Sequence, residues 1–441
     1  MVTVTTGATL PGTGRYDTGR VVAEVLAPFA AQGVIVRRRA AVRVAARFDT
    51  DARAVRLLRQ LRDRYGRGPL RVPLPGRDIA LVLDPDDVRR VLTDEAAVFR
   101  PASTDKVAAL ARFQPHGVLV STGRLRQSRR RFVERVLQPD RPEHDLAGTF
   151  DRIVADETAR LTAATGGRLD WDAFARYWWR IVRRVVLGDA AADDEDVIEE
   201  LAALRRSANW GGAGPERRAV RRRFQERIDD YVRWSEPGSL AALVAGTPAA
   251  DGVDPAGQVP HWLFAFDAAG IAAYRTLALL AARPDAARRA RAEAAGGDLD
   301  FLRACVLEAV RLWPTTMAIL RESVTDTDWR GARLPAGTQL VIVSALFHRD
   351  EDTVRHAHAF APAEWLSGHA AAAPAIVPFS AGPGRCPGRA VVLLVTSLAV
   401  AALLRYGQPH PVGDTPLTRQ RLPGTLDHYA LRVALAPADT R

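Results

Sequence analysis

The stretch Phe379-Ser380-Ala381-Gly382-Pro383-Gly384-Arg385-Cys386-Pro387-Gly388 decides how the rest of the chain is interpreted. It stands directly before an apolar segment that predicts a buried helix over about residues 387–406. The unpaired N–H groups and positive dipole end of a helix favour the thiolate form of such a cysteine. The glycines let the backbone approach a flat group, and a thiolate bound to haem iron suits O–O cleavage. Taken alone, however, a lone cysteine in a glycine-rich turn is more often a packing residue.

The composition is that of a folded globular protein. The chain has 441 residues, of which 47% are hydrophobic and 26% charged, with a formal net charge of +11. These values argue against disorder. The two cysteines, Cys305 and Cys386, exclude a disulfide scaffold and favour a reducing compartment. The sequence has neither an uninterrupted apolar run of about 18 residues nor a signal pattern in its first twenty residues, so we expect a soluble cytoplasmic protein without a membrane partner.

The positive charge is carried by arginine, since Lys106 is the only lysine. Blocks such as Arg129-Arg130-Arg131 and Arg221-Arg222-Arg223 are one possible footprint of nucleic-acid binding. No aromatic-interleaved basic module accompanies them, and solvated helix faces explain them as well. We therefore expect no nucleic-acid partner.

The pattern predicts a mainly α protein with a small β region, folded as a single large domain. Residues 1–50 are expected to form an N-terminal segment of uncertain order, and 51–441 the main domain. Short apolar runs around a Pro-Gly pair predict a hairpin over about 70–83. We expect a loop over 100–122, helices from 124 to about 312, and one of these opened by Pro215. The segment over about 259–282 is apolar all round and should cross the protein centre.

Several separated motifs resemble those of the cytochrome P450 superfamily. Glu308-Ala309-Val310-Arg311 matches its E-x-x-R pair, and Phe360-Ala361-Pro362-Ala363-Glu364-Trp365 stands in the place of its F-x-P-x-R-W segment. Arg126-Gln127-Ser128-Arg129-Arg130 matches the arginine stretch of the helix that crosses the haem. The order and spacing agree from about residue 70 onward. The resemblance implies the cytochrome P450 fold over the main domain.

The resemblance also implies roles for individual residues. Cys386 would be the axial ligand of the iron of heme b, with Phe379 covering the site, and Glu308 and Arg311 a buried structural pair. The haem propionates would be bound by arginines, for which the candidates are Arg126, Arg130, Arg321 and Arg385.

Three departures from the family pattern are visible. Gly384 replaces the His or Arg that commonly stands two residues before the cysteine, so Arg385 is expected to replace it from another angle. Glu364 replaces the arginine of the second motif, so the Glu308 carboxylate must be satisfied differently. In the central helix Asp267 fills the acid position, but Ala268 replaces the threonine whose hydroxyl orients water for proton delivery. We expect Asp267, helix carbonyls near a local widening at Gly270, or the substrate to hold that water.

The resemblance places a largely apolar substrate pocket at Phe113, Phe264, Ala268, Met317 and Ile319. Arg275, two turns beyond Asp267, is expected to be too remote to bind a substrate carboxylate. Electrons would come from NAD(P)H through a separate ferredoxin or flavodoxin and its reductase, steered by the arginines of the helix that begins near Arg124.

The expected function is that of a haem-thiolate monooxygenase that hydroxylates, epoxidises or oxidatively couples a small organic molecule, plausibly a secondary metabolite. The missing threonine keeps a second hypothesis open, a peroxide-driven or non-monooxygenating haem enzyme such as a peroxygenase, coupling enzyme or isomerase. A haem protein that only binds a ligand is a third.

Overall fold

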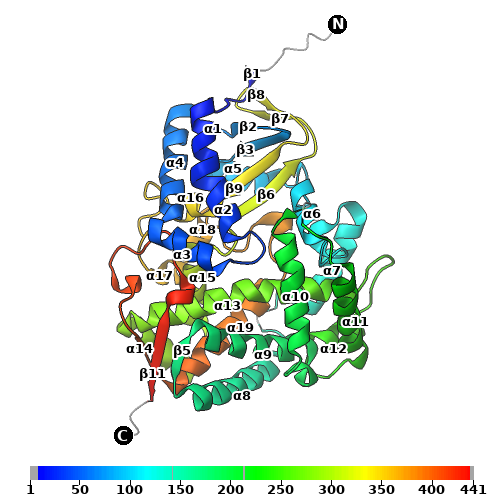
Figure 1. Cartoon of the computed structure of the whole chain (residues 1–441), viewed down its shortest axis with the longest axis vertical. Coiled ribbons are helices and arrows are strands. Elements are labelled where there is room, and N and C mark those ends of the chain that lie inside the picture. Colours follow the sequence, from blue (N-terminus) through cyan, green and yellow to red (C-terminus); the bar gives the residue numbers. More distant parts are fainter. Residues whose placement is uncertain (1–7, 142, 212–213, 438–441) are drawn as a thin grey trace.

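The computed structural model describes residues 8–141, 143–211 and 214–437. Figure 1 shows a sheet-containing part, with α1–α4 beside the strands, above a helical part that α13 crosses. Each part has its own apolar core: one is built from the helices between α7 and α19, and the other from the sheet, α4 and the N-terminal helices. The mainly α fold with a small β region, expected from the sequence, is confirmed.

The helices and helical turns are α1 (Arg15–Val21), η1 (Val22–Leu26), α2 (Ala27–Gln32), α3 (Arg39–Phe48), α4 (Thr50–Tyr65), α5 (Pro85–Arg89), η2 (Arg90–Asp94), α6 (Thr104–Leu110), η3 (Val118–Val120), α7 (Gly123–Leu137), α8 (Ala147–Thr165), α9 (Trp171–Leu187), η4 (Asp189–Ala191), α10 (Glu195–Ala208), α11 (Arg218–Trp234), α12 (Leu240–Gly246), η6 (Ala256–Gln258), α13 (Val259–Ala281), α14 (Pro284–Ala295), α15 (Asp300–Leu312), α16 (Ser344–His348), α17 (Ala363–Leu366), α18 (His369–Ala372), η7 (Gly382–Gly384), α19 (Arg389–Tyr406), η8 (Pro416–Thr418) and η9 (His428–Ala430).

The strands are β1 (Ala8–Thr9), β2 (Leu70–Leu74), β3 (Arg77–Leu81), β4 (Phe99–Arg100), β5 (Arg168–Asp170), β6 (Ala318–Ser323), β7 (Thr327–Trp329), β8 (Ala332–Leu334), β9 (Gln339–Val343), β10 (Gly407–Pro411) and β11 (Arg432–Pro437). They form a five-stranded sheet in the order β2-β3-β9-β6-β4 and two three-stranded sheets, β1-β8-β7 and β10-β11-β5. The predicted hairpin is β2–β3, paired antiparallel with Val72 opposite Ile79.

Three local expectations need revision. The N-terminal segment of uncertain order contains α1, η1, α2 and α3, while its first seven residues lie outside the described part. The loop expected over 100–122 is wrong where α6 forms, because Ser103 begins a helix whose Leu110 is buried. The helix expected at Pro215 begins only at Arg218.

The two most apolar helices lie in the interior. Residues Ala256–Ala281 and Arg389–Tyr406 are long and apolar enough to cross a membrane by composition, yet 78% of each apolar window is buried inside the protein. They pack against each other and on α15. Their even apolarity is therefore that of core helices of a globular fold, as expected for the central helix.

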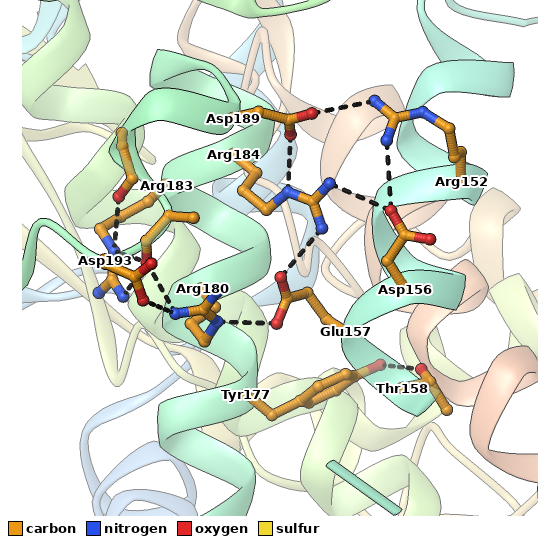
Figure 2. Close-up of polar contacts among 12 residues, drawn as sticks. Arg152, Asp156, Glu157, Thr158, Tyr177, Arg180, Arg183, Arg184, Asp189 and Asp193 are labelled. Carbon is orange, nitrogen blue, oxygen red and sulfur yellow. Dashed lines mark hydrogen bonds and ion pairs between the residues drawn. The ribbon is translucent and has the colours of Figure 1, made fainter. Parts of the chain in front are cut away.

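Charged side chains join α8 to α9 (Figure 2). Glu157, only 2% exposed, accepts hydrogen bonds from Arg180 at 2.8 Å and Arg184 at 2.9 Å. Arg184 also contacts Asp156 and Asp189, and Arg152 contacts the same two aspartates. We call this set, with Asp193 on Arg180, the α8–α9 ion-pair network. Each guanidinium named here contacts at least one carboxylate.

Candidate functional site

The cysteine loop is fixed between η2, α7 and α19. The backbone N–H of Cys386 donates to the carbonyl of Phe379 at 2.9 Å, which closes the loop. Gly382 lies at φ +56°, and a Cβ there would collide with the carbonyl of Leu92, so only glycine fits at this position. Arg130 on α7 donates to the carbonyl of Arg385 at 2.6 Å. The loop thus presents Cys386 just before the first turn of α19.

The Cys386 thiol is partly buried on the inner side of this loop. Burial raises its pKa, against the lowering effect of the Gly388 N–H and of Arg130. A metal bound to the sulfur would take the place of the proton. Phe379 is also partly buried and packs against the apolar cluster that Ala272 of α13 shares with α15 and α19. The cysteine loop therefore packs through Phe379 against side chains of the central helix, α15 and α19.

Three cations lie close to one another beside the cysteine loop, and we call them the Cys-loop cation cluster: Lys106, Arg126 and Arg321. Arg126 donates to the carbonyl of Pro383 at 2.8 Å, while its Nε is buried without a partner. Arg321 on β6 is 4% exposed and donates to Ser380 Oγ at 3.0 Å. None of the three forms an ion pair with a carboxylate within the described ranges. Buried charge without a partner of opposite sign is costly, so this cluster fits an anion.

Lys106 is the member of this cluster that sequence reasoning missed. Its Nζ donates to the carbonyls of Pro101 at 2.6 Å and Leu320 at 3.2 Å. Burial, with repulsion from Arg321 and Arg126, lowers its pKa to about 7. The sequence did give one signal, because Lys106 is the only lysine in an arginine-rich chain.

The other two propionate candidates are placed differently. Arg130 is paired with Glu134 at 2.6 Å, so its charge is already balanced. Arg385 is exposed on the loop. The space that a side chain at Gly384 would fill is taken by the guanidinium of Arg321 instead, since a Cβ at Gly384 would collide with its Nη2. Arg321, from a different strand, therefore occupies the position expected of the missing His or Arg.

The two E-x-x-R residues, Glu308 and Arg311, form a fully buried ion pair. Glu308 accepts from Arg311 Nε at 2.7 Å and Nη2 at 2.6 Å, and both side chains are 0% exposed. The carboxylate also accepts from the Ala361 N–H and from Trp365 Nε1, each at 2.9 Å. Burial opposes ionisation of Glu308, but these donors, Arg311 foremost, hold its pKa below the usual value. Because Glu364 stands in place of the family's arginine, the Glu308 carboxylate needs another donor. The indole of Trp365 supplies that hydrogen bond.

The central helix presents an ion pair in place of a hydroxyl. Asp267 accepts from Arg205 of α10 at 2.5 Å, and the guanidinium also lies 5.3 Å from the ring centre of Phe264. Arg205 is 3% exposed on its side chain. The expected widening at Gly270 is wrong: α13 is a continuous α-helix, and a Cβ at Gly270 would come within 2.5 Å of the Trp178 ring. Trp178 Nε1 donates to the Phe266 carbonyl at 2.7 Å.

The expected pocket residues lie on three elements. Phe113 contacts Phe264 of α13, with ring centres 5.4 Å apart. Phe264 and Ala268 are partly exposed on the same face of α13, four residues apart. Met317 and Ile319, at the start of β6, are 9% and 7% exposed.

A profile of the family described as Cytochrome P450 matches residues 272–426. A putative cytochrome P450 137 of Mycobacterium tuberculosis is 34% identical over 138 residues, which cover 31% of this chain and 29% of that protein. A cyclooctat-9-en-7-ol 5-monooxygenase of Streptomyces melanosporofaciens is 29% identical over 121 residues, 27% of this chain and 26% of that one. The matched segments thus span less than a third of these relatives.

Solved structures resemble a much larger part of the chain. The retinoic acid-bound cyanobacterial CYP120A1 superposes with a TM-score of 0.69 at 18% identity, covering 86% of this chain and 94% of that one. The heme domain of cytochrome P450DA superposes with a TM-score of 0.70 at 17% identity, covering 88% and 92%. At these identities the likeness concerns the fold.

Proposed function

Because the chain belongs to the cytochrome P450 superfamily, we propose that it is a haem-thiolate monooxygenase that oxidises a small, largely apolar organic molecule. One observation carries the proposal: the Cys386 thiol lies before an apolar helix, beside a cluster of cations that have no carboxylate partner in the described part of the chain. A haem offers an iron to the thiol and two carboxylates to the cations.

The residues of this chain fit a haem in the following way. Cys386 would supply the axial thiolate, and Phe379 would shield the sulfur from water. Arg126, Arg321 and Lys106 would bind the propionates, with Arg130 and Arg385 holding and flanking the loop. The Glu308–Arg311 pair would fix α15 against the segment before the loop, since Arg311 also donates to the carbonyls of His348 and Ala357. When bound, the haem supplies oxygen activation.

Substrate would lie against the apolar residues of the pocket. Phe113, Phe264, Ala268, Met317 and Ile319 offer apolar surface, which suits a largely apolar molecule. The named relatives are consistent with this, since one is a monooxygenase of cyclooctat-9-en-7-ol and another binds retinoic acid. Secondary metabolism is a plausible setting for such a substrate. Residues 51–441 would form the haem domain, with 1–50 as an N-terminal segment before it.

Proton handling would depend on the substrate. Ala268 offers no hydroxyl, and the Asp267 carboxylate is held by Arg205. A hydroxyl group or water molecule that enters with the substrate would have to make the hydrogen bond that the side chain of Ala268 cannot make. We therefore expect poor coupling of electron use to product when a poorly fitting ligand is bound.

The same observation favours a second candidate, a peroxide-driven haem enzyme, because peroxide carries its own protons and oxygen. The test compares purified protein given NAD(P)H, ferredoxin and reductase with protein given hydrogen peroxide alone. Product from the first system supports the monooxygenase. Product from peroxide alone, with none from oxygen and reductant, supports the alternative.

The coupling ratio, product formed per NAD(P)H consumed, tests the role of the central helix. Ala268→Thr should raise the ratio with a poorly fitting ligand, and Asp267→Asn should lower it. A high ratio that neither substitution changes would contradict substrate-dependent proton delivery.

The electron donor would dock beside the cysteine loop. Exposed arginines gather there on α7 and the loop: Arg124, Arg131, Arg135 and Arg385. An acidic ferredoxin or flavodoxin, reduced by NAD(P)H through its reductase in the cytoplasm, suits this charge. Reduction should slow as ionic strength rises, and an unchanged rate would contradict electrostatic docking.

A further inference from the structure

A second set of unpaired polar groups lines a small, partly open cavity that shares Met317 with the proposed substrate pocket. The cavity lies between α2, α4, α13, the approach to β6 and the C-terminal loop, and its polar lining includes Gln32, Arg37, Asp51, Arg275 and His428. Met317 forms part of the same wall. Gln32 is 5% exposed, Arg275 8% and His428 0%. Such groups are normally all hydrogen-bonded when buried.

Here, several of them lack a partner. Gln32 Nε2, Arg275 Nε and both ring nitrogens of His428 are buried without a hydrogen bond, and so is Asp51 Oδ1. Arg275 does donate from Nη1 to the Trp313 carbonyl at 2.8 Å. The described residues of the lining therefore include unused hydrogen-bond donors, those of Gln32 and Arg275 among them.

The two arginines of the lining also have no direct carboxylate partner. Neither Arg37 nor Arg275 forms an ion pair with a carboxylate of residues 8–141, 143–211 or 214–437; their guanidinium contacts are to carbonyls and to the Met317 sulfur. Asp51 is the one acid among the described residues of the lining, and Asp267 and Asp427 act at longer range on Arg37 and on Arg275, respectively. Burial lowers the pKa of Arg275 to about 9, helped by repulsion from Arg37, as expected where an anion is absent.

The cavity adjoins the proposed substrate pocket. Arg37 Nη1 lies 3.0 Å from Sδ of Met317, which belongs to both. On α13, Arg275 stands seven residues after Ala268, so the two side chains leave the helix in nearly the same direction, about 10 Å apart along its axis. A molecule anchored at Arg275 by one end would need an apolar body of about that length to reach Ala268.

We infer that this cavity binds the carboxylate end of a mainly apolar substrate, with Arg275, Arg37 and Gln32 as its donors. This assignment rests on the proposed function and names the substrate class of that site. It differs from the expectation that Arg275 is too remote to bind a substrate carboxylate, because the proposed anchor lies at the far end of the molecule from the position oxidised.

The test titrates the haem-loaded protein with three acids, each beside its neutral primary amide: decanoic acid, 6-phenylhexanoic acid and dehydroabietic acid. Binding is followed by the change in haem absorbance. At least one acid should bind about 10- to 100-fold more tightly than its amide, the range expected for charge-assisted hydrogen bonds. Arg275→Met and Arg37→Met should each reduce this preference to about threefold or less, and Arg275→Lys should retain part of it.

Arg39→Met is the matched control, because Arg39 is close to Arg37 in sequence but exposed and paired with Asp172. It should leave the preference unchanged. Thermal unfolding gives a second readout: without ligand, Arg275→Met should be at least as stable as the wild type, since it removes an unpaired buried charge. A purely structural arginine would instead leave the variant less stable.

Equal binding of acids and amides by the wild type would overturn the inference, as would equal weakening of both by Arg275→Met and Arg37→Met. The reduced, carbon monoxide-bound absorbance of each protein is recorded first. Absence of the thiolate-type band in the wild type would overturn the proposed function itself, whereas a normal band without acid preference would overturn only the carboxylate assignment.

Discussion

The α8–α9 ion-pair network and the Cys-loop cation cluster use similar side chains in opposite ways. In the network, Arg152, Arg180 and Arg184 each contact a carboxylate, and Figure 2 shows guanidinium groups and carboxylates alternating along the contacts. In the cluster, the partners of Lys106, Arg126 and Arg321 among the described residues are carbonyl and hydroxyl oxygens. Paired charges stabilise the chain itself, whereas unpaired charges are stabilised by a bound anion. The two regions should therefore respond differently to substitution.

The largest effect is expected at the most completely paired site. Glu308→Gln leaves Arg311 as a buried charge without its carboxylate, which should cost about 3–5 kcal/mol in the free energy of unfolding. Denaturant unfolding of the haem-free protein measures it. Glu364→Gln, at the partly exposed pair with His369, is the control and should change stability by about 0.5 kcal/mol or less. Equal effects would remove the distinction between buried and exposed pairs.

Within the network, Glu157→Gln should lower the free energy of unfolding by about 2 kcal/mol, because two guanidinium groups lose their buried partner while remaining partly solvated. The same denaturant titration applies. Asp151→Asn, at the exposed pair with Arg405, serves for comparison and should stay within about 0.5 kcal/mol. A loss at Glu157 no larger than at Asp151 would mean that the network contributes nothing to stability.

In the cluster, Arg321→Met should leave the haem-free protein as stable as the wild type, because it removes an unpaired charge. Haem loss should become about 10- to 100-fold faster, since a charge-assisted hydrogen bond to a propionate is lost. Transfer of haem to excess apomyoglobin measures the rate. Arg333→Met, at an exposed pair with Asp326, should not alter it. Unchanged haem loss together with reduced stability would place Arg321 among the structural arginines.

The smallest effect, counted per pH unit, is the pH dependence that Lys106 causes. The pKa of Lys106 is lowered to about 7 in the folded, haem-free protein, so the unfolded chain binds more protons between pH 7 and about 10.5. The cost of burying this charge is complete below about pH 7 and disappears as pH rises. Relative to Lys106→Met, the wild type should gain at most about 1.4 kcal/mol per pH unit above pH 7.

Haem should abolish that pH dependence, because a propionate next to Lys106 favours its charged form. Unfolding of both proteins, with and without haem, at several pH values checks this. A slope that is the same in the loaded and haem-free wild type would show that no propionate reaches Lys106.

Elements whose signal lies within one short stretch of residues could be predicted from the sequence. The apolar run after Cys386 predicted α19, and the resemblance of Glu308-Ala309-Val310-Arg311 to the family's E-x-x-R motif predicted a pair of side chains that the structure places in contact. The apolar segment of α13 was located for the same reason. These features depend on neighbours in the chain, which periodicity describes well.

Features that join distant segments were not predictable in this way. Arg205 meets Asp267 across 62 positions, and Trp365 meets Glu308 across 57, with no pattern that links the partners. Arg321 fills the space over Gly384 because β6 runs past the cysteine loop, which only the tertiary fold determines. Helix α6 was missed because the prolines and hydroxyl residues around it favour a loop. In the folded protein, burial of Leu110 stabilises the helix.

The absorbance of haem-loaded protein, reduced under carbon monoxide, tests the central claim most directly. With Cys386 as the thiolate ligand, the wild type should show the strongly red-shifted Soret band typical of thiolate coordination, and Cys386→Ser should lose it while Cys305→Ser retains it. A wild-type band at the position typical of imidazole ligation, or one that survives in Cys386→Ser, would contradict the account.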